Sequence, residues 1–468
     1  MKARAPSRIA ATLAALLLLS HCAQAPVGGD RETVPPPGPR EVELGAQAQR
    51  EVLKEYARLE HAALQAYVTG IGQRLARHSP RAGVAWQFSV LDSADANAFS
   101  LPDGQVYISR GILPYLDSEA GLAAVIAHEI GHVSARHGVS LAGAPAAAGL
   151  GSVLVPEAEP VPGAPLLRAL AGARTAGYGR ESEREADRIG AACLEAAGYD
   201  PQAMADAADR LRALAAAHGD VRDFSPGAYH AVADSAAPRR RLRSRAAPAA
   251  PAADDAYLRR LVGLAVGDSA EQGVLRDNRL LHARLGLTLQ FPPGWQVRNR
   301  ADRVVATNPA GDALLELQAG PKRGTPLDTL QKAVRLDPGT RYDSGRLGGQ
   351  PAAFAAGAQG GRPVVVAAVV VDGAQYLIAG MTRDTAAYER ERSALRAAIN
   401  SFRELTPAEK EAARAYTLRL ATTRPGQTMA TLARQSRLGA DGEPLLRLMN
   451  GLHPDGEPEP GRLLKIVE

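Results

Sequence analysis

The sequence predicts a multidomain α+β protein, with a mainly helical domain first, a small α+β domain second and a βααβ module last. Three observations support this prediction. The chain has 468 residues, too many for one ordinary core at roughly 150 residues per domain. Apolar residues recur at helical spacing through much of the first half, whereas short apolar runs separated by turn residues follow residue 279. A Pro- and Ala-rich stretch, AAPAAPAA (246–253), divides the two regions.

Residues 1–25 have the pattern of an export signal. Basic residues precede an apolar run that is too short to cross a membrane, and small residues follow it. Cys22 lies where a bacterial lipoprotein signal carries its lipidated cysteine, and ordinary cleavage after Ala25 is the alternative. Residues 26–40 are rich in Pro and Gly and predict a stiff tether. We therefore expect a periplasmic protein of the bacterial envelope, held to the outer membrane as a lipoprotein if Cys22 is modified.

Charge and cysteine content exclude two classes of protein. A net charge of +5 over this length is too small to indicate nucleic-acid binding. The chain has 2 cysteines, so no disulfide framework is expected, and Cys193 is interpreted as a small buried hydrophobic residue.

The mainly helical domain is assigned to residues 41–245. Its expected elements are helical residues 41–78, strands within 84–93 and 105–111, a helix around 121–138, and helices at 180–198 and 199–219. The LPDG stretch (101–104) marks a turn, and Asp200 with Pro201 starts the last helix. Residues 139–177 are largely Ala, Gly and Pro, which predicts a flap or broken hairpin that could cover a cleft as a lid.

The rest of the chain is divided into three parts. Residues 246–278 are interpreted as a linker. Residues 279–405 are interpreted as a small α+β domain with a helix near 386–402, and nothing in them indicates a ligand. Residues 412–468 predict a strand, two short helices and a strand.

The segment GLAAVIAHEIGHVSARHG (121–138) places two histidines and a glutamate among apolar residues. A helix with this pattern is buried, and a buried glutamate needs a specific partner. His128 and His132 are four residues apart, so they project from one helix face and can share a metal ion. Glu129 lies about 100° round the helix from His128, where it would flank the ion and accept a proton from water.

A catalytic zinc site takes three protein ligands, so one more is expected from another element. Glu181, Glu183 and Glu185 compete for this role. Glu183 precedes Asp187 by four residues, so one helix face would offer a ligand together with an acid that holds a histidine N–H. We therefore choose Glu183 as the third ligand of one Zn²⁺ per chain, with Asp187 as the supporting acid.

Two further histidines are assigned lesser roles. His137 follows His132 by five residues, which turns it away from the two histidine ligands. A structural role, or a contact behind the ligands, is expected for it. His230 is interpreted as a surface or turn histidine.

Three stretches, NAFSLPDGQVYISRGIL (97–113), AAVIAHEIGHVSARHG (123–138) and GRESEREADRIG (179–190), resemble the zinc metallopeptidases related to the CAAX prenyl protease. Their soluble bacterial envelope members, of the outer-membrane-assembly-protease type, are the most similar. The resemblance spans residues 41–245 and depends on an HExxH helix followed by an ExxAD segment. It implies a gluzincin fold with zinc bound by the two histidines and Glu183, and with Glu129 as catalytic base. Asp187, the second catalytic residue, would lie behind His128.

The same resemblance implies a site for the substrate main chain. The strand with Val106, Tyr107 and Ile108 would form the sheet edge that faces the active site. A substrate peptide would add to this edge as an extra strand.

The C-terminal segment resembles a LysM module. The resemblance is carried by RPGQTMATLARQ (424–435), LMNGL (448–452) and PGRLLKIVE (460–468). It implies binding to the N-acetylglucosamine chains of peptidoglycan. A small domain that serves only for packing or for a protein contact is the alternative.

Together these features predict a zinc-dependent endopeptidase of the bacterial cell envelope that hydrolyses unfolded or misassembled envelope proteins. Expected partners are these substrates, peptidoglycan through the C-terminal module, and the membrane through a lipid anchor on Cys22. Nucleic acid is not expected. The alternative is a non-proteolytic periplasmic assembly factor or chaperone with structural zinc. A latent enzyme covered by residues 139–177 is a third hypothesis.

Overall fold

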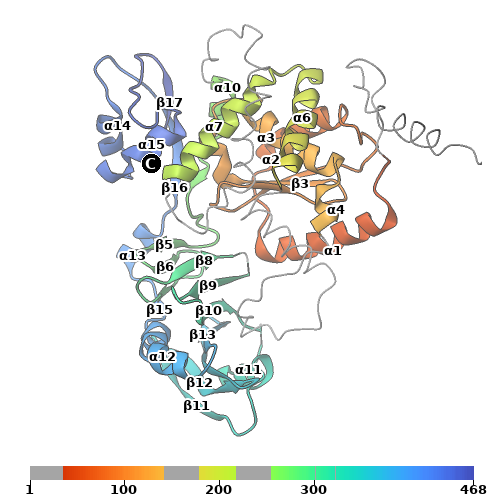
Figure 1. Ribbon diagram of the computed structural model, residues 1–468. Coiled ribbons are helices and arrows are strands. Elements are labelled where there is room, and N and C mark those ends of the chain that lie inside the picture. The colour runs from red at the N-terminus through yellow and green to blue at the C-terminus, as the bar shows by residue number, and fades with distance from the viewer. Residues whose placement is uncertain (1–34, 142–178, 218–253, 301, 322) are drawn as a thin grey trace, which may run out of the picture. The chain divides into compact units, whose positions relative to one another are not determined.

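The computed structural model describes residues 35–141, 179–217 and 254–468, except residues 301 and 322 (Figure 1). All of them belong to one compact unit, residues 35–468. Cys22, His230, the stretch 246–253 and nearly all of the expected flap lie outside the described residues. No helix within the described ranges is both long enough and apolar enough to cross a bilayer.

The first half of the described chain packs helices around a small sheet (red to yellow-green in Figure 1). Its elements are α1 (Pro39–Glu55), α2 (Ala62–Ala76), β1 (Gln87–Leu91), β2 (Ala98–Ser100), β3 (Gln105–Ser109), the 3-10 helix η1 (Arg110–Tyr115), α3 (Glu119–Ser134), α4 (His137–Leu141), α6 (Arg180–Ala196) and α7 (Gln202–Ala217). The expected helical stretch 41–78 is thus two helices separated by a short extended segment. Helix α7 starts as expected, because the Asp200 carboxylate accepts the Gln202 N–H at 2.9 Å.

Strand β3 lies in the middle of this sheet, between β1 and β2. Val106, Tyr107 and Ile108 pair in parallel with β1 on one side and antiparallel with β2 on the other. The prediction that these three residues form the open edge is therefore wrong. Alternating apolar residues identify a strand but not its neighbours, and the 3-residue strand β2 is too short to give such a signal. The edge on that side is β2 itself.

Helix α3 is buried along nearly its whole length, as its apolar surroundings predict. Every residue from Gly121 to Ser134 is buried. Ser118 caps the start of the helix, since its hydroxyl accepts the Gly121 N–H at 3.1 Å. It packs against α2, α6, α7 and β2, which places the histidine-containing segment inside the core.

The middle of the chain forms two antiparallel sheets. The smaller has the order β15-β7-β6-β5, and the larger has the order β11-β12-β13-β14-β10-β9-β8. The strands and helices of this part are β5 (Val274–Arg276), β6 (Arg279–His282), β7 (Leu287–Gln290), β8 (Gln296–Asn299), β9 (Arg303–Thr307), β10 (Ala313–Ala319), α11 (Pro326–Ala333), β11 (Arg341–Leu347), β12 (Gln350–Gln359), β13 (Arg362–Val371), β14 (Ala374–Thr382), α12 (Thr385–Asn400), β15 (Arg403–Glu404) and α13 (Pro407–Ala412). Apolar side chains cover both faces of the larger sheet, with α12 on one face and α11 on the other. Helix α12 is the helix expected near 386–402.

The C-terminal module has the order strand, helix, helix, strand (blue in Figure 1). Its elements are β16 (Tyr416–Thr422), α14 (Met429–Gln435), the 3-10 helix η2 (Ala440–Gly442), α15 (Glu443–Met449) and β17 (Leu463–Val467). A third strand, β4 (Ala265–Val266), pairs with β16. Residues 254–276, expected to be part of a linker, instead form α10 (Asp255–Arg260), β4 and β5. The physical reason is that apolar side chains here, such as Tyr257 and Leu261, are fully buried.

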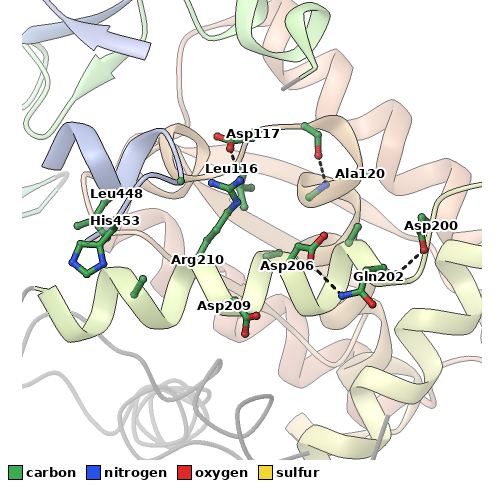
Figure 2. A pocket seen from close by; sticks show the side chains of 16 residues that line it. Leu116, Asp117, Ala120, Asp200, Gln202, Asp206, Asp209, Arg210, Leu448 and His453 are labelled. Carbon is green, nitrogen blue, oxygen red and sulfur yellow. Dashed lines mark hydrogen bonds and ion pairs between the residues drawn. The ribbon is translucent and has the colours of Figure 1, made fainter. Parts of the chain in front are cut away.

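The C-terminal module is held against the start of α3 by a buried charge. Lys465 of β17 is 1% exposed, and its ammonium donates to Leu116 O at 2.9 Å and to Asp117 Oδ1 at 2.6 Å. Asp117 also pairs with Arg210, which Figure 2 shows reaching across from α7. A cavity of about 540 Å³ lies at this junction, lined by α7, the start of α3 and the chain that follows α15.

Replacing Asp117 with asparagine is expected to destabilise the protein by about 3 kcal/mol, because Lys465 would remain buried without its carboxylate partner. Burial lowers the pKa of Lys465, and Asp117 opposes that effect by favouring the charged amine. Denaturant unfolding at pH 7 measures the change. The control is Asp255→Asn, at a carboxylate that is 60% exposed. A loss for Asp117→Asn no larger than that of the control would contradict a structural role for the charge pair.

Candidate metal centre

Helix α3 presents His128 and His132 one turn apart on the same face. Their Nε2 atoms are 2.9 Å apart. Glu183 of α6 places Oε2 at 3.4 Å from His128 Nε2 and at 3.7 Å from His132 Nε2. All three side chains are buried, and one ligand atom from each lies within 4.8 Å of the others. In the described part of the chain, no second group of His, Cys, Asp and Glu side chains converges in this way.

The environment of Glu183 fits a bound cation. Its side chain is 0% exposed, and neither carboxylate oxygen has a hydrogen-bond partner among the described residues. Burial alone would raise the pKa of Glu183, but the imidazoles of His128 and His132 outweigh it and lower this pKa to about 2. A buried ionised carboxylate needs a positive charge beside it, and a cation held between Glu183 and the two imidazoles would supply one. Two imidazole nitrogens and one carboxylate are a donor set that zinc accepts.

Asp187 contacts His128 from behind. Its Oδ1 is 3.0 Å from Nδ1 of His128, on the far side of the ring from His132. An Nδ1–H donated to this carboxylate leaves the Nε2 lone pair directed at the centre. Burial would lower the pKa of His128, but Asp187 and Glu183 together raise it well above its ordinary value. The spacing of four residues between Glu183 and Asp187 thus brings both carboxylates to the same histidine.

Glu129 is buried beside the ligand group but is not part of it. Its Oε2 accepts a hydrogen bond from Ser100 Oγ at 2.9 Å, and the same hydroxyl lies 3.3 Å from the Glu129 carbonyl oxygen. Ser100 ends β2, so the edge strand meets α3 at Glu129. Sequence reasoning missed Ser100 as the partner of this glutamate. The sequence did offer one signal for Ser100, because it lies in NAFS (97–100), at the start of the first stretch that resembles the metallopeptidases.

His137 lies behind His132. Its Nδ1 is 3.0 Å from Nδ1 of His132, and its Nε2 is 3.3 Å from Oε2 of Glu185. Burial lowers the pKa of His137, and the neighbouring His132 lowers it further. A contact behind the ligands is therefore present, but the expectation that His137 turns away from His132 is wrong. Helical spacing does not extend to His137, because α3 ends at Ser134 and Arg136 has φ of 62°. Of the three glutamates considered as third ligand, Glu185 contacts His137 instead, and Glu181 is exposed.

Two glycines allow α3 and α6 to approach closely enough to form the centre. A Cβ atom on Gly131 of α3 would lie 2.8 Å from the carbonyl carbon of Ala186. A Cβ atom on Gly190 of α6 would lie 2.8 Å from the carbonyl oxygen of Ala127. The helices therefore touch backbone to backbone at two points. This contact sets the separation between the histidines of α3 and the carboxylates of α6.

Comparison with known proteins gives a family match over the part of the chain that carries the centre. Residues 62–231 match the model of Peptidase family M48. The chain is 32% identical over 187 residues to the beta-barrel assembly-enhancing protease of Escherichia coli, covering 37% of this chain and 37% of the relative. It is 30% identical over 188 residues to the mitochondrial metalloendopeptidase OMA1 of Schizosaccharomyces pombe, covering 40% of this chain and 56% of the relative. The chain thus spans less than two thirds of the length of either relative.

Among solved structures, the cyanobacterial PsbP of Synechocystis matches with 14% identity and a TM-score of 0.22, over 28% of this chain and 96% of that structure. A score this low does not indicate a shared fold.

The five residues expected to form the centre all lie inside the matched segment: His128, Glu129, His132, Glu183 and Asp187. The HExxH motif (128–132) and the ExxAD motif (183–187) both lie within the segment that matches the family model. Residues 62–231 are therefore similar to peptidase family M48 over the segment that contains the candidate metal centre.

Proposed function

We propose that this protein is a zinc-dependent endopeptidase that hydrolyses peptide bonds of unfolded or misassembled proteins of the bacterial envelope. The observation that carries the proposal is the convergence of His128, His132 and Glu183 on one point, with Glu129 beside them and outside the ligand group. The names of the two relatives, a protease and a metalloendopeptidase, support a hydrolytic role.

A zinc ion held by these three side chains would supply a Lewis acid that lowers the pKa of water to about 7 and polarises the scissile carbonyl. The Glu129 carboxylate, oriented by the Ser100 hydroxyl, accepts the proton that the attacking water loses. The same carboxyl group then donates this proton to the leaving amine nitrogen. Asp187 keeps His128 in the tautomer whose Nε2 can bind a metal.

The number of ligands favours this function over an assembly factor with structural zinc. Structural zinc sites are closed by four protein ligands, whereas catalytic sites use three and leave one position for water. Three such groups converge among the residues that the structure describes. Two further buried acidic side chains nearby have other partners: Glu129 accepts a hydrogen bond from Ser100, and Asp187 contacts Nδ1 of His128.

An extended substrate would add at the outer edge of β2; because Ala98, Phe99 and Ser100 are themselves buried, this requires the edge to become accessible first. Main-chain groups of Asn97 and Leu101 bond toward the β3 side. By the alternation of an antiparallel pair, the main-chain groups of Ala98 and Ser100 point away from β3. A peptide that adds there as a strand passes Ser100 and therefore runs beside Glu129. Such pairing contacts the peptide main chain, which suits substrates without a fixed fold.

The location and the remaining partners belong to the same proposal. The Escherichia coli relative is named for β-barrel assembly, and transmembrane barrels of bacteria are outer-membrane proteins. The export-signal pattern and Cys22 support an outer-membrane lipoprotein that faces the periplasm. The resemblance of residues 412–468 to a LysM module supports binding to peptidoglycan.

Replacing Glu129 with glutamine is expected to lower kcat for hydrolysis of unfolded casein by about 10²- to 10⁴-fold, because an amide cannot accept the proton from water. Zinc content should stay at the wild-type value, since Glu129 is not among the ligands. A fluorescent casein assay and metal analysis by mass spectrometry measure the two quantities. Glu181→Gln, an exposed change at the start of α6, is the control and should leave both unchanged. Wild-type cleavage by Glu129→Gln would reject the peptidase and favour the assembly factor.

A further inference from the structure

We propose that His137 is a positioning residue for the metal ligand His132, and that Glu185 in turn orients His137. The inference depends on the metal centre proposed above. The two histidine ligands are then held in different ways. The Asp187 carboxylate contacts His128 directly. His132 instead contacts the His137 imidazole, which in turn contacts the Glu185 carboxylate.

His132, His137 and Glu185 form a hydrogen-bonded relay. The position of each proton in it follows from which ring nitrogen of His132 faces the metal centre. His132 turns Nε2 toward His128 and Glu183. If that nitrogen offers its lone pair, the ring proton must lie on Nδ1, because a neutral imidazole has one N–H. This Nδ1–H donates to Nδ1 of His137 at 3.0 Å. His137 then carries its own proton on Nε2 and donates it to Glu185 Oε2 at 3.3 Å.

A backbone turn brings His137 into this position. Arg136 has φ of 62°, a left-handed conformation that interrupts the helix between α3 and α4, and His137, the first residue of α4, then lies against His132. The Arg136 guanidinium donates from Nε to Glu41 Oε1 at 3.1 Å and from Nη2 to Glu41 Oε2 at 2.8 Å. Glu41 also pairs with the buried Arg81, which donates at 3.0 Å to a carbonyl in the last turn of α3. Helix α1 thus anchors the turn that carries His137.

Because both rings are buried, His132 depends on Nδ1 of His137 as the hydrogen-bond acceptor for its own Nδ1–H. His132 and His137 are both buried, so an Nδ1–H that lost its acceptor would remain unsatisfied at a cost of about 1–3 kcal/mol. The His132 ring can avoid that cost by rotating or by moving its proton to Nε2. Either change removes the Nε2 lone pair from the centre. The side chain of Glu185 is 45% exposed, so water can partly replace it and its loss matters less.

Zinc affinity of His137 and Glu185 variants tests the inference. Competition with a fluorescent chelator should show an affinity about 10- to 100-fold weaker for His137→Phe than for wild type. His137→Asn should recover most of this loss, because its amide oxygen can accept near the position of Nδ1. Glu185→Ala should lose less than His137→Phe, and the exposed control Glu181→Gln should match wild type. Denaturant unfolding with chelator present shows whether each variant is folded.

Ring-nitrogen NMR of the metal-free protein provides a readout that general destabilisation would not move. The expected tautomers are Nδ1–H for His132 and Nε2–H for His137, with the His132 preference lost in His137→Phe and restored in His137→Asn. A folded His137→Phe protein with wild-type zinc affinity, or a wild-type His132 protonated on Nε2 alone, would overturn the inference. Zinc binding without casein cleavage would instead reject the proposed enzyme and leave the relay intact.

Discussion

Replacing Glu183 with alanine is expected to abolish stoichiometric zinc binding and, with it, hydrolysis of unfolded casein. Loss of a residue that merely supports a ligand lowers metal affinity by about 10- to 100-fold, so loss of the ligand itself should exceed that range. Glu183 is 0% exposed, and no other described acidic side chain joins the histidine pair to take its place. Metal analysis of the purified variant and a fluorescent casein assay measure the two effects.

A stability measurement gives a second test of Glu183 as a ligand. Zinc at about 100 times the dissociation constant should stabilise the wild type by about 2.7 kcal/mol and the variant by nothing. Glu181→Ala, two residues earlier on α6 and exposed, should respond to zinc like the wild type. If Glu183→Ala retained one zinc per chain with wild-type affinity, the ligand group would be wrong as described.

Replacing Gly131 with alanine is expected to destabilise the protein by about 1–3 kcal/mol and to weaken zinc binding. The new methyl group would sit 2.8 Å from both Cα and the carbonyl carbon of Ala186, so α6 would have to move away from α3. That movement separates the histidines on α3 from Glu183 and Asp187 on α6. Denaturant unfolding in the presence of chelator and chelator competition for zinc measure the two effects separately.

A matched glycine isolates the packing effect from helix propensity. Gly70, in α2, is also within a helix, but a Cβ atom there would meet nothing within 4 Å. Gly70→Ala should therefore stabilise the protein by about 0.5–1 kcal/mol and leave zinc affinity unchanged. Equal effects of the two substitutions would show that α3 and α6 do not depend on close backbone contact at Gly131.

The spacing of residues within single helices predicted which side chains of the centre face the same way. His128 and His132 share one face of α3, and Glu183 and Asp187 share one face of α6. An α-helix repeats about every 3.6 residues, so residues four apart lie together whatever surrounds the helix. The helices and strands of the middle and C-terminal parts were also predicted from local patterns, because such patterns depend only on residues close together in the sequence.

The errors of prediction concern contacts between elements. The edge of the small sheet was assigned to Val106, Tyr107 and Ile108, whereas the intervening β2 pairs with that strand. The region before residue 279 was expected to be a linker, whereas its residues pair with β16 of the C-terminal module. In both cases the local pattern does not show which strand lies alongside, because pairing depends on residues far apart in the sequence.

Local sequence was therefore enough to indicate which histidines and carboxylates share a helix face, because helical periodicity is a short-range property of the chain. Only the folded chain shows Ser100 on Glu129, His137 on His132 and Lys465 against the start of α3. These contacts form where elements distant in sequence, or joined by an unusual turn, pack together. Their geometry is set by close packing, such as that of Gly131 against Ala186, and no spacing along the chain encodes it.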